Sequence, residues 1–333
     1  AKIGAGTTGA RTSALNTLLE SLGYKTSGDA SFGSATTAAL KSFQASAGRR
    51  ASGTADAQTW AALFMSLDSV APKITGSAKV GQTLSVTTGD WGPGPVSLSY
   101  QWYRGDAAVN GATGDSYAVQ PADAGASLRV AVTGLKTGYT LTVRTSAATD
   151  MVDNASFTAT PAPKISGKAV VGARLTATAG TWSPAPVGLA YQWTRDGKAI
   201  SGATASTYTV QAADVDATLK VSVTGTRPGY NTVTKTSEGT DPVAKGTLSA
   251  KTPTIGGTRK VGKTLTAVPG TWSPAGVTFT YQWYRGSAKI ADATGRTYTL
   301  TKADKGKKIS VHLRGTLDGY TTLEKASGLT AIH

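Results

Sequence analysis

The sequence predicts a multidomain protein, with a small all-α bundle at the N-terminus followed by three tandem all-β sandwiches. The prediction rests on a repeat and on a change of periodicity. A Tyr-Gln-Trp frame recurs at Tyr100, Tyr191 and Tyr281, with spacings of 91 and 90 residues. A period near ninety is too long for a solenoid repeat and suits a small self-contained domain. The first seventy residues lack this frame and show helical periodicity instead.

Each copy of the frame carries the same landmarks in the same order. A Gly-x-Trp turn precedes the Tyr-Gln-Trp strand, and a Thr/Ser-rich run ending in Tyr, an Asp turn and a Gly-Tyr pair follow it. The turn tryptophans are Trp91, Trp182 and Trp272, the runs end at Tyr117, Tyr208 and Tyr298, and the pairs are Gly138-Tyr139, Gly229-Tyr230 and Gly319-Tyr320. We therefore expect domains at residues 1–68, 72–152, 161–243 and 252–333. The joints at 151–163 and 244–253 are either linkers or extra strands that pair with a neighbour.

Apolar and polar residues alternate in several short runs of each repeat. In the first copy these runs cover residues 83–87, 98–102 and 128–132, and the later copies have the same runs at the same offsets. Period-two runs separated by Gly, Pro and Asp turns every eight to twelve residues are typical of a β-sandwich.

The strand tryptophans are expected in the core of each sandwich. Trp102, Trp193 and Trp283 each share a strand face with the tyrosine two residues earlier, because residues i and i+2 point to the same side. One aromatic side chain buries ~150–250 Å² at about 25 cal/mol per Å². A domain of about ninety residues without disulfides needs such a core. The turn tryptophans are expected to pack as well, with a ligand contact as the alternative.

Each Tyr-Gln-Trp strand ends in an arginine, and an aspartate lies at a turn further along the same repeat. We predict that these residues form ion pairs that fix a corner of each sandwich, with ligand binding as the weaker interpretation. The predicted pairs are Arg104–Asp123, Arg195–Asp214 and Arg285–Asp304.

These landmarks resemble the immunoglobulin-like (Ig-like) fold, with a core Trp and an Asp-x-Gly corner but no disulfide. Over all three copies the repeats are similar to bacterial Ig-like modules of actinobacterial secreted and surface proteins, which carry Val-Gly-x-Thr-Leu, Gly-Thr-Trp-Ser-Pro and Tyr-Gln-Trp. The second copy departs twice, with Asp216 in place of the glycine of the corner and Arg174 in place of the threonine. The resemblance implies spacer or assembly modules.

The N-terminal segment predicts three short helices around one small core. Leu15, Leu18, Leu19 and Leu22 have the i, i+3, i+4, i+7 spacing of one helix face, and Gly23 suits a helix C-terminus. Two further helical runs lie around residues 38–43 and 59–64, with Phe43 and Trp60 as core candidates.

The residues of this segment resemble the three-helix peptidoglycan-binding domain of bacteria. The matching run is Leu-Leu-x-x-Leu-Gly-Tyr at 18–24, Asp-x-x-Phe-Gly-x-x-Thr at 29–36, Ala-Leu-x-x-Phe-Gln at 39–44, Gly48, Gly53 and Thr-Trp-x-x-Leu at 59–63. Ala30 stands where the family usually has glycine, and Asn16 where it often has glutamine. The resemblance covers about one fifth of the chain and implies a shallow groove for a glycan or a stem peptide.

Five side chains are the candidates for that ligand. Tyr24 is able to stack on a sugar, and Gln44 matches the family motif. Arg49 or Arg50 is able to pair with a carboxylate. Asp29 is the fifth candidate, with a helix cap or a turn as its structural alternative.

The positive charge lies mainly in the last repeat. Residues 244–333 hold fourteen Lys and Arg against four Asp and Glu, a net +10 of the total +15. The clustered residues are Arg259, Lys260, Lys263, Lys302, Lys305, Lys307 and Lys308. They form either a solvated strand edge or a contact with a wall polyanion such as teichoic acid. Nucleic acid is an unfavoured partner, because no aromatic residues are interleaved.

The sequence offers little for catalysis. It has no cysteine, two histidines, and no metal-ligand, Gly-x-Ser-x-Gly or phosphate-loop motif, so we expect neither an enzyme nor a cofactor or metal. No apolar run is long enough to span a membrane. No signal peptide is recognised, so an exported protein is expected in its mature form. We expect a secreted, wall-associated protein that binds peptidoglycan, with Ig-like spacers. The alternative is a structural surface protein that self-assembles into a fibre or coat.

Overall fold

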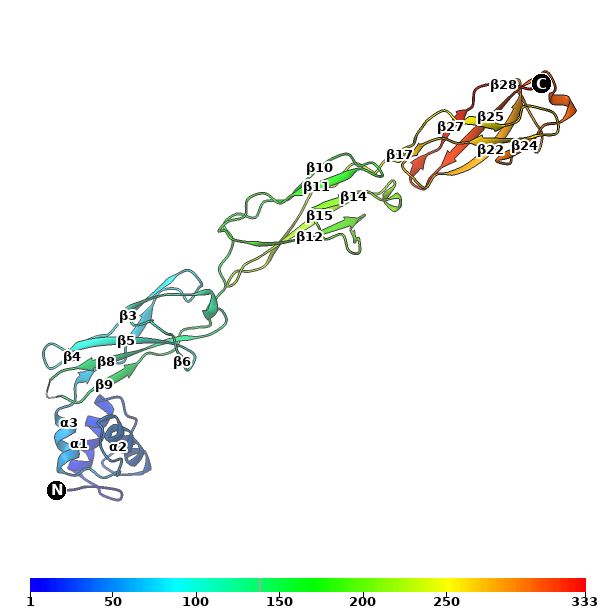
Figure 1. Cartoon of the computed structure of the whole chain (residues 1–333). Coiled ribbons are helices and arrows are strands. Elements are labelled where there is room, and N and C mark those ends of the chain that lie inside the picture. The colour runs from blue at the N-terminus through cyan, green and yellow to red at the C-terminus, as the bar shows by residue number, and fades with distance from the viewer. Residues whose placement is uncertain (138) are drawn as a thin grey trace. The chain divides into compact units, whose positions relative to one another are not determined.

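The computed structural model describes residues 1–137 and 139–333, so Gly138 of the first Gly-Tyr pair lies outside the described residues. The chain divides into two compact units. The first consists of Ala1–Phe157 and Arg227–Asn231, and the second of Thr158–Thr226 and Thr232–His333. Figure 1 labels helices and strands along the whole chain. None of the helices in the described part is long and apolar enough to cross a bilayer.

The N-terminal domain contains helices α1 (Ala10–Ser21), α2 (Ser34–Ser46) and α3 (Ala57–Phe64), as the periodicity predicts. Leu15, Leu19, Leu40 and Phe43 lie in one buried cluster between them. Gly23 follows α1 with a left-handed φ of 85°, which an L side chain adopts only with strain. Asp56 caps the N-terminus of α3, where its Oδ1 accepts the N–H of Thr59 at 2.7 Å.

Each repeat is a sandwich of a three-stranded and a larger sheet, all antiparallel. In the first repeat these are β2 (Lys73–Thr75), β3 (Thr83–Thr87) and β7 (Ser116–Ala118) against β6 (Ala107–Ala108), β5 (Ser97–Arg104), β8 (Leu128–Leu135) and β9 (Thr142–Thr145). In the second they are β10 (Lys164–Ser166), β11 (Arg174–Thr178) and β14 (Thr207–Thr209) against β13 (Lys198–Ala199), β12 (Gly188–Arg195), β15 (Leu219–Thr226) and β16 (Val233–Thr236).

The third repeat keeps this order and adds one strand. It has β19 (Thr254–Gly257), β20 (Thr264–Val268) and β24 (Thr297–Thr299) against β23 (Ala288–Lys289), β22 (Thr278–Arg285), β25 (Lys308–Thr316) and β27 (Leu323–Ala326), with β28 (Thr330–Ala331) also on β25. Short pieces complete the repeats: β1 (Asp68–Ser69), β4 (Trp91–Gly92), β17 (Gly246–Thr247), β18 (Ser249–Ala250), β21 (Trp272–Ser273), β26 (Tyr320–Thr321) and the 3₁₀ turns η1 (Pro121–Asp123), η2 (Ala212–Asp214) and η3 (Lys302–Asp304).

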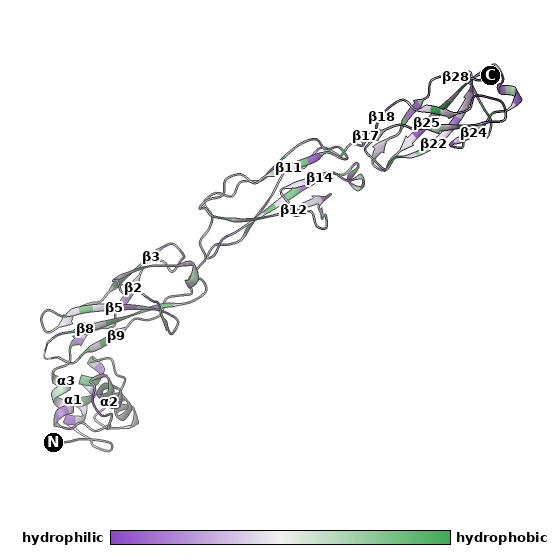
Figure 2. Ribbon diagram, viewed as in Figure 1, coloured by the Kyte–Doolittle hydropathy of each residue, from purple (hydrophilic) through white to green (hydrophobic). Residues whose placement is uncertain are grey.

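This strand order is that of an Ig-like sandwich, in which the first, second and fifth main strands oppose the rest. The inward residues of β8 and β15 are buried while their neighbours are more exposed, and Figure 2 shows the corresponding change of hydropathy along the strands. The three strand tryptophans are 0 % exposed. Each indole lies against the tyrosine of the Thr/Ser-rich run, with ring centroids 5.4–5.6 Å apart and interplanar angles of 27–31°.

The predicted arginine and aspartate of each repeat do form an ion pair. The closest N–O distances are 2.6 Å for Arg104–Asp123, 2.6 Å for Arg195–Asp214 and 2.7 Å for Arg285–Asp304. The other carboxylate oxygen accepts hydrogen bonds from the tyrosine hydroxyl, at 2.8 Å, and from a backbone N–H, at 2.7 Å. The aspartates are fully buried and the arginines about one third exposed, so each network closes a sandwich corner.

These networks predict a loss of stability at alkaline pH. Burial, followed by the hydrogen bond to the aspartate, raises the pKa of Tyr117 and of Tyr208 to about 12. The unfolded chain releases the same protons near pH 10, so the free energy of unfolding should be unaffected below pH 10 and fall between about pH 10 and 12. An absorbance titration of tyrosinate should show late-ionising groups, and Tyr208→Phe should remove one of them. An unchanged late phase in that variant would contradict this assignment.

Candidate functional site

The candidate ligand residues of the N-terminal domain divide into buried and exposed groups. Gln44 was expected to reach a ligand, but its side chain is 1 % exposed. Its Nε2 donates to the carbonyl oxygen of Thr54 at 2.8 Å and to Oγ1 of Thr59 at 3.1 Å, while its Oε1 accepts the N–H of Gly53 at 2.9 Å. Gln44 therefore fastens the loop before α3 to α2, and we assign it a structural role.

Asp29 holds the turn that precedes α2. Its Oδ1 accepts hydrogen bonds from the hydroxyls of Ser31 and Ser27, at 2.6 and 2.8 Å, and from the N–H of Ser31 at 3.0 Å. These bonds hold the pKa of the Asp29 carboxyl below its usual value. Neighbouring Ala30 has no positive φ, so the backbone here does not require the glycine that is usual in the family.

Arg49 and Arg50 follow α2 with exposed side chains. The Arg49 N–H donates to the carbonyl oxygen of Gln44 at 2.7 Å, and its Nη1 donates to Oε1 of Gln58 at 3.2 Å. Arg49 lines a shallow groove of about 460 Å³. The other lining residues are Ser46, Ala47, Gly48, Ala61, Ala62, Met65, Tyr139, Thr140 and Leu141.

Tyr24 lies beside this groove rather than in it. Its hydroxyl is 2.6 Å from Oγ of Ser46, and its ring meets the edge of Phe43 at 6.0 Å. A small adjoining cleft is lined by Tyr24 and shares Ser46, Thr140 and Leu141 with the groove. The structure therefore brings Tyr24 and Arg49 to neighbouring hollows of one surface, while Asp29 lines neither.

The first repeat supplies three residues of the groove, Tyr139, Thr140 and Leu141, which the sequence did not indicate. The N–H of Thr140 donates to the carbonyl oxygen of Met65 at 3.1 Å, which joins the loop after β8 to the chain leaving α3. Tyr139 belongs to a recurrent Gly-Tyr pair, so it was visible as a landmark, but nothing in the sequence assigned it a partner. Lys136 Nζ lies 5.6 Å from the centre of the Tyr139 ring, which adds a second cation near the groove.

Arg144 fixes the two sides of this surface to one another. It is 9 % exposed; its Nε donates to Oγ of Ser69 at 2.9 Å and its Nη2 to the carbonyl oxygen of Ser21 at 3.1 Å. Desolvation lowers the pKa of Arg144, which remains cationic because arginine titrates far above neutrality. Ser21 is the last residue of α1, where unpaired carbonyls and the helix dipole favour a cation.

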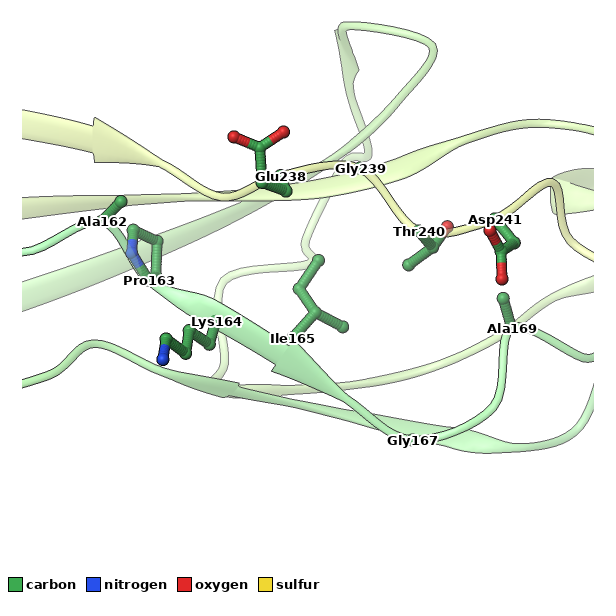
Figure 3. A pocket seen from close by; sticks show the side chains of 10 residues that line it. All are labelled: Ala162, Pro163, Lys164, Ile165, Gly167, Ala169, Glu238, Gly239, Thr240 and Asp241. Atoms are coloured by element: carbon green, nitrogen blue, oxygen red, sulfur yellow. The ribbon is translucent and has the colours of Figure 1, made fainter.

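A second hollow lies in the second repeat, between β10 and the segment after β16 (Figure 3). It measures about 540 Å³, and its charged lining residues are Lys164, Glu238 and Asp241. Figure 3 shows the Glu238 carboxylate directed away from β10. Across the described residues, no group of three or more His, Asp or Glu is arranged to hold a metal ion. The groove beside Arg49, with a cation, an aromatic ring and an apolar wall, is the better candidate for binding.

Comparison with known proteins agrees with these two kinds of domain. Residues 8–63 match the model of the putative peptidoglycan binding domain family. The chain is 30 % identical over 154 residues to the highly immunogenic outer capsid protein of Enterobacteria phage T4, a match that covers 44 % of this chain. The chain spans about two fifths of the length of that relative.

Solved structures with similar folds include the three N-terminal domains of the bacteriophage RB49 highly immunogenic outer capsid protein. That likeness covers 77 % of this chain and 96 % of the other, at 16 % identity and a TM-score of 0.23. An ICAM-5 ectodomain fragment is similar over 79 % of this chain and 76 % of its own, at 18 % identity and a TM-score of 0.29. The chain thus carries an N-terminal domain that matches the peptidoglycan-binding family, followed by three tandem Ig-like domains.

Proposed function

We propose that this protein is a non-catalytic, wall-associated surface protein whose N-terminal domain binds peptidoglycan, with the Ig-like repeats as spacers. The observation that carries the proposal is the family match over residues 8–63, on a domain whose exposed Arg49 lines an open groove.

The groove suits a ligand with both carboxylate and apolar parts. Arg49 presents a planar guanidinium that is able to bind a carboxylate of a stem peptide through two N–H donors. Tyr139 and Leu141 offer an aromatic ring and an exposed apolar side chain, on which a sugar ring or an alkyl group is able to lie. Arg144 would keep these residues in place without touching the ligand.

Replacing Arg49 with alanine is expected to weaken binding to purified sacculi about tenfold, since a charge-assisted hydrogen bond contributes ~1.5–3 kcal/mol. Arg11→Ala is the matched control, because Arg11 is an exposed arginine of the same domain that does not line the groove. Bound protein is measured by sedimentation with increasing amounts of sacculi. Equal binding of the two variants would refute the groove as the site, and a wild-type chain that never sediments with sacculi would refute wall binding itself.

A structural coat role is the second candidate, and the 30 % identity to a phage outer capsid protein favours it. In that case the Ig-like repeats themselves would attach to a surface or assemble on one. They would not act as spacers for a wall-binding domain. Analytical ultracentrifugation of the purified chain separates the two proposals. Sedimentation as large species without sacculi supports assembly, whereas a single small species that sediments only with sacculi supports wall binding.

A further inference from the structure

The basic residues of the third repeat form one surface, although they come from two stretches of sequence. The N–H of Gly262 donates to the carbonyl oxygen of Leu300 at 2.8 Å, and that of Leu300 to the carbonyl oxygen of Lys263 at 3.0 Å. These bonds tie Gly262 and Lys263 to Leu300, in the segment that leads into the η3 turn. All seven basic side chains of the two clusters are exposed. We call this surface the basic end; it consists of Arg259, Lys260, Lys263, Lys302, Lys305, Lys307 and Lys308.

The corresponding surface of the second repeat receives the Gly-Tyr loop of the third. A Cβ added to Gly319 would lie 2.7 Å from Cα of Ala212 and 3.1 Å from Cγ1 of Val171, so the loop backbone rests directly on that surface. Tyr320 packs against the apolar core of the second repeat. Only glycine permits this approach, since φ at Gly319 is also 75°.

The first repeat presents the same kind of surface. The loop Arg227–Asn231 belongs to the first unit, where Gly229 lies against Pro121 and Val80 in the same way and Tyr230 packs on the apolar core. One backbone bond identifies the corresponding positions in all three repeats: Gly125 N–H to Val152 O, Asp216 N–H to Val243 O and Gly306 N–H to Ile332 O, at 2.9–3.1 Å.

The side chains of this surface change character in the third repeat. At the seven positions the first repeat has one basic residue and the second has none, whereas the third has seven. In the order of the basic end, the first repeat has Ala78, Lys79, Gln82, Pro121, Ala124, Ala126 and Ser127, and the second has Ala169, Val170, Ala173, Ala212, Val215, Ala217 and Thr218. The aspartate of the turn does not neutralise the cations, because Asp304 is fully buried and paired with Arg285.

We propose that the basic end binds a flexible linear phosphate polymer of the polyol-phosphate kind, in place of a Gly-Tyr loop. Covering seven crowded cations with an apolar loop would cost much of their hydration, whereas a chain of regularly spaced anions is attracted to them. Six of the seven are lysines, whose hydrated point charges suit phosphates that remain in water.

The test measures binding of the full chain to poly(glycerol phosphate) by fluorescence anisotropy at several salt concentrations. Binding should weaken steeply with salt, with a log–log slope approaching about −5 if all seven cations contact phosphates. The test variant replaces Lys302, Lys305, Lys307 and Lys308 with the second repeat's residues, as Lys302→Ala, Lys305→Val, Lys307→Ala and Lys308→Thr. Its affinity should fall by at least about tenfold and its slope should become shallower by nearly 3.

The matched control removes four charges of the last ninety residues that lie outside the basic end: Lys245→Ala, Lys251→Ala, Arg314→Ala and Lys325→Ala. An equal loss in test and control variants would show that net charge alone attracts the polymer, and would overturn the proposal. Tighter binding of single-stranded DNA than of poly(glycerol phosphate) would overturn it as well. The assay contains no peptidoglycan and Arg49 is intact in both variants, so its outcome is independent of the wall-binding proposal.

Discussion

Replacing Arg195 with methionine is expected to destabilise the second repeat by about 3 kcal/mol, because the change leaves the Asp214 carboxylate buried without its cation. Asp214 is fully buried, and its Oδ1 accepts the Arg195 Nε–H at 2.6 Å. The hydroxyl of Tyr208 and the N–H of Gln211 remain as partners of Oδ2, but neither carries charge. Methionine fills much of the volume of arginine, so the loss reports mainly the ion pair.

Differential scanning calorimetry of the full chain measures this effect as a shift of one transition. For a domain of this size, 3 kcal/mol corresponds to a decrease in melting temperature of at least about 10 °C. Arg174→Met is the control, since Arg174 is an exposed arginine of the same repeat whose Nη2 donates to the hydroxyl of Thr207 at 2.9 Å, in an exposed contact. Binding to sacculi should be unchanged in both variants. Lost binding with an unaltered transition would assign Arg195 to a ligand site instead.

Replacing Gly315 with valine is expected to destabilise the third repeat by a similar amount, about 3 kcal/mol. The six-membered ring of Trp272 lies on the bare backbone of Gly315, and an added Cβ would come within 2.9 Å of ring carbons Cε3 and Cη2. Trp272 is 9 % exposed, so moving the ring would return much of an aromatic surface of ~150–250 Å² to water, at ~25 cal/mol per Å².

Gly328→Val is the matched control for this close approach. Gly328 lies in the same repeat, has no positive φ and has no atom within 4 Å of an added Cβ. Urea denaturation followed by tryptophan fluorescence should show early exposure of an indole in Gly315→Val alone. If the two glycine variants unfolded alike, Trp272 would not be packed as described.

The repeat frame made the interior of the sandwiches predictable. The three copies show which residues keep the same spacing in every repeat. A tryptophan that recurs on a strand of alternating apolar and polar residues is expected to point into the core. The same comparison linked Arg195 to Asp214, since a lone charge of each sign at fixed spacing indicates a pair. Comparing the copies also shows that Asp216 occupies a position at which the other two repeats have glycine. Its backbone adopts a left-handed φ of 64° there.

The candidate site was less predictable, because it depends on contacts between distant segments. Gln44 matches a family motif, but whether its amide points outward is set by the loop that closes over it, at residues 52–54. Tyr139 and Leu141 reach the groove because the first repeat packs on the helical domain, through Arg144 and through the hydrogen bond between Thr140 and Met65. The two basic clusters likewise become one surface through hydrogen bonds between strands, which no local pattern encodes.

Binding of the full chain to sacculi stripped of their anionic polymers, at high salt, tests the central claim most directly. These conditions suppress any contribution of the basic end, whose attraction depends on phosphate and on low ionic strength. The account predicts that wild-type protein still sediments with the stripped sacculi and that Arg49→Ala does so markedly less. Protein that remains in the supernatant under these conditions would contradict peptidoglycan binding by the N-terminal domain.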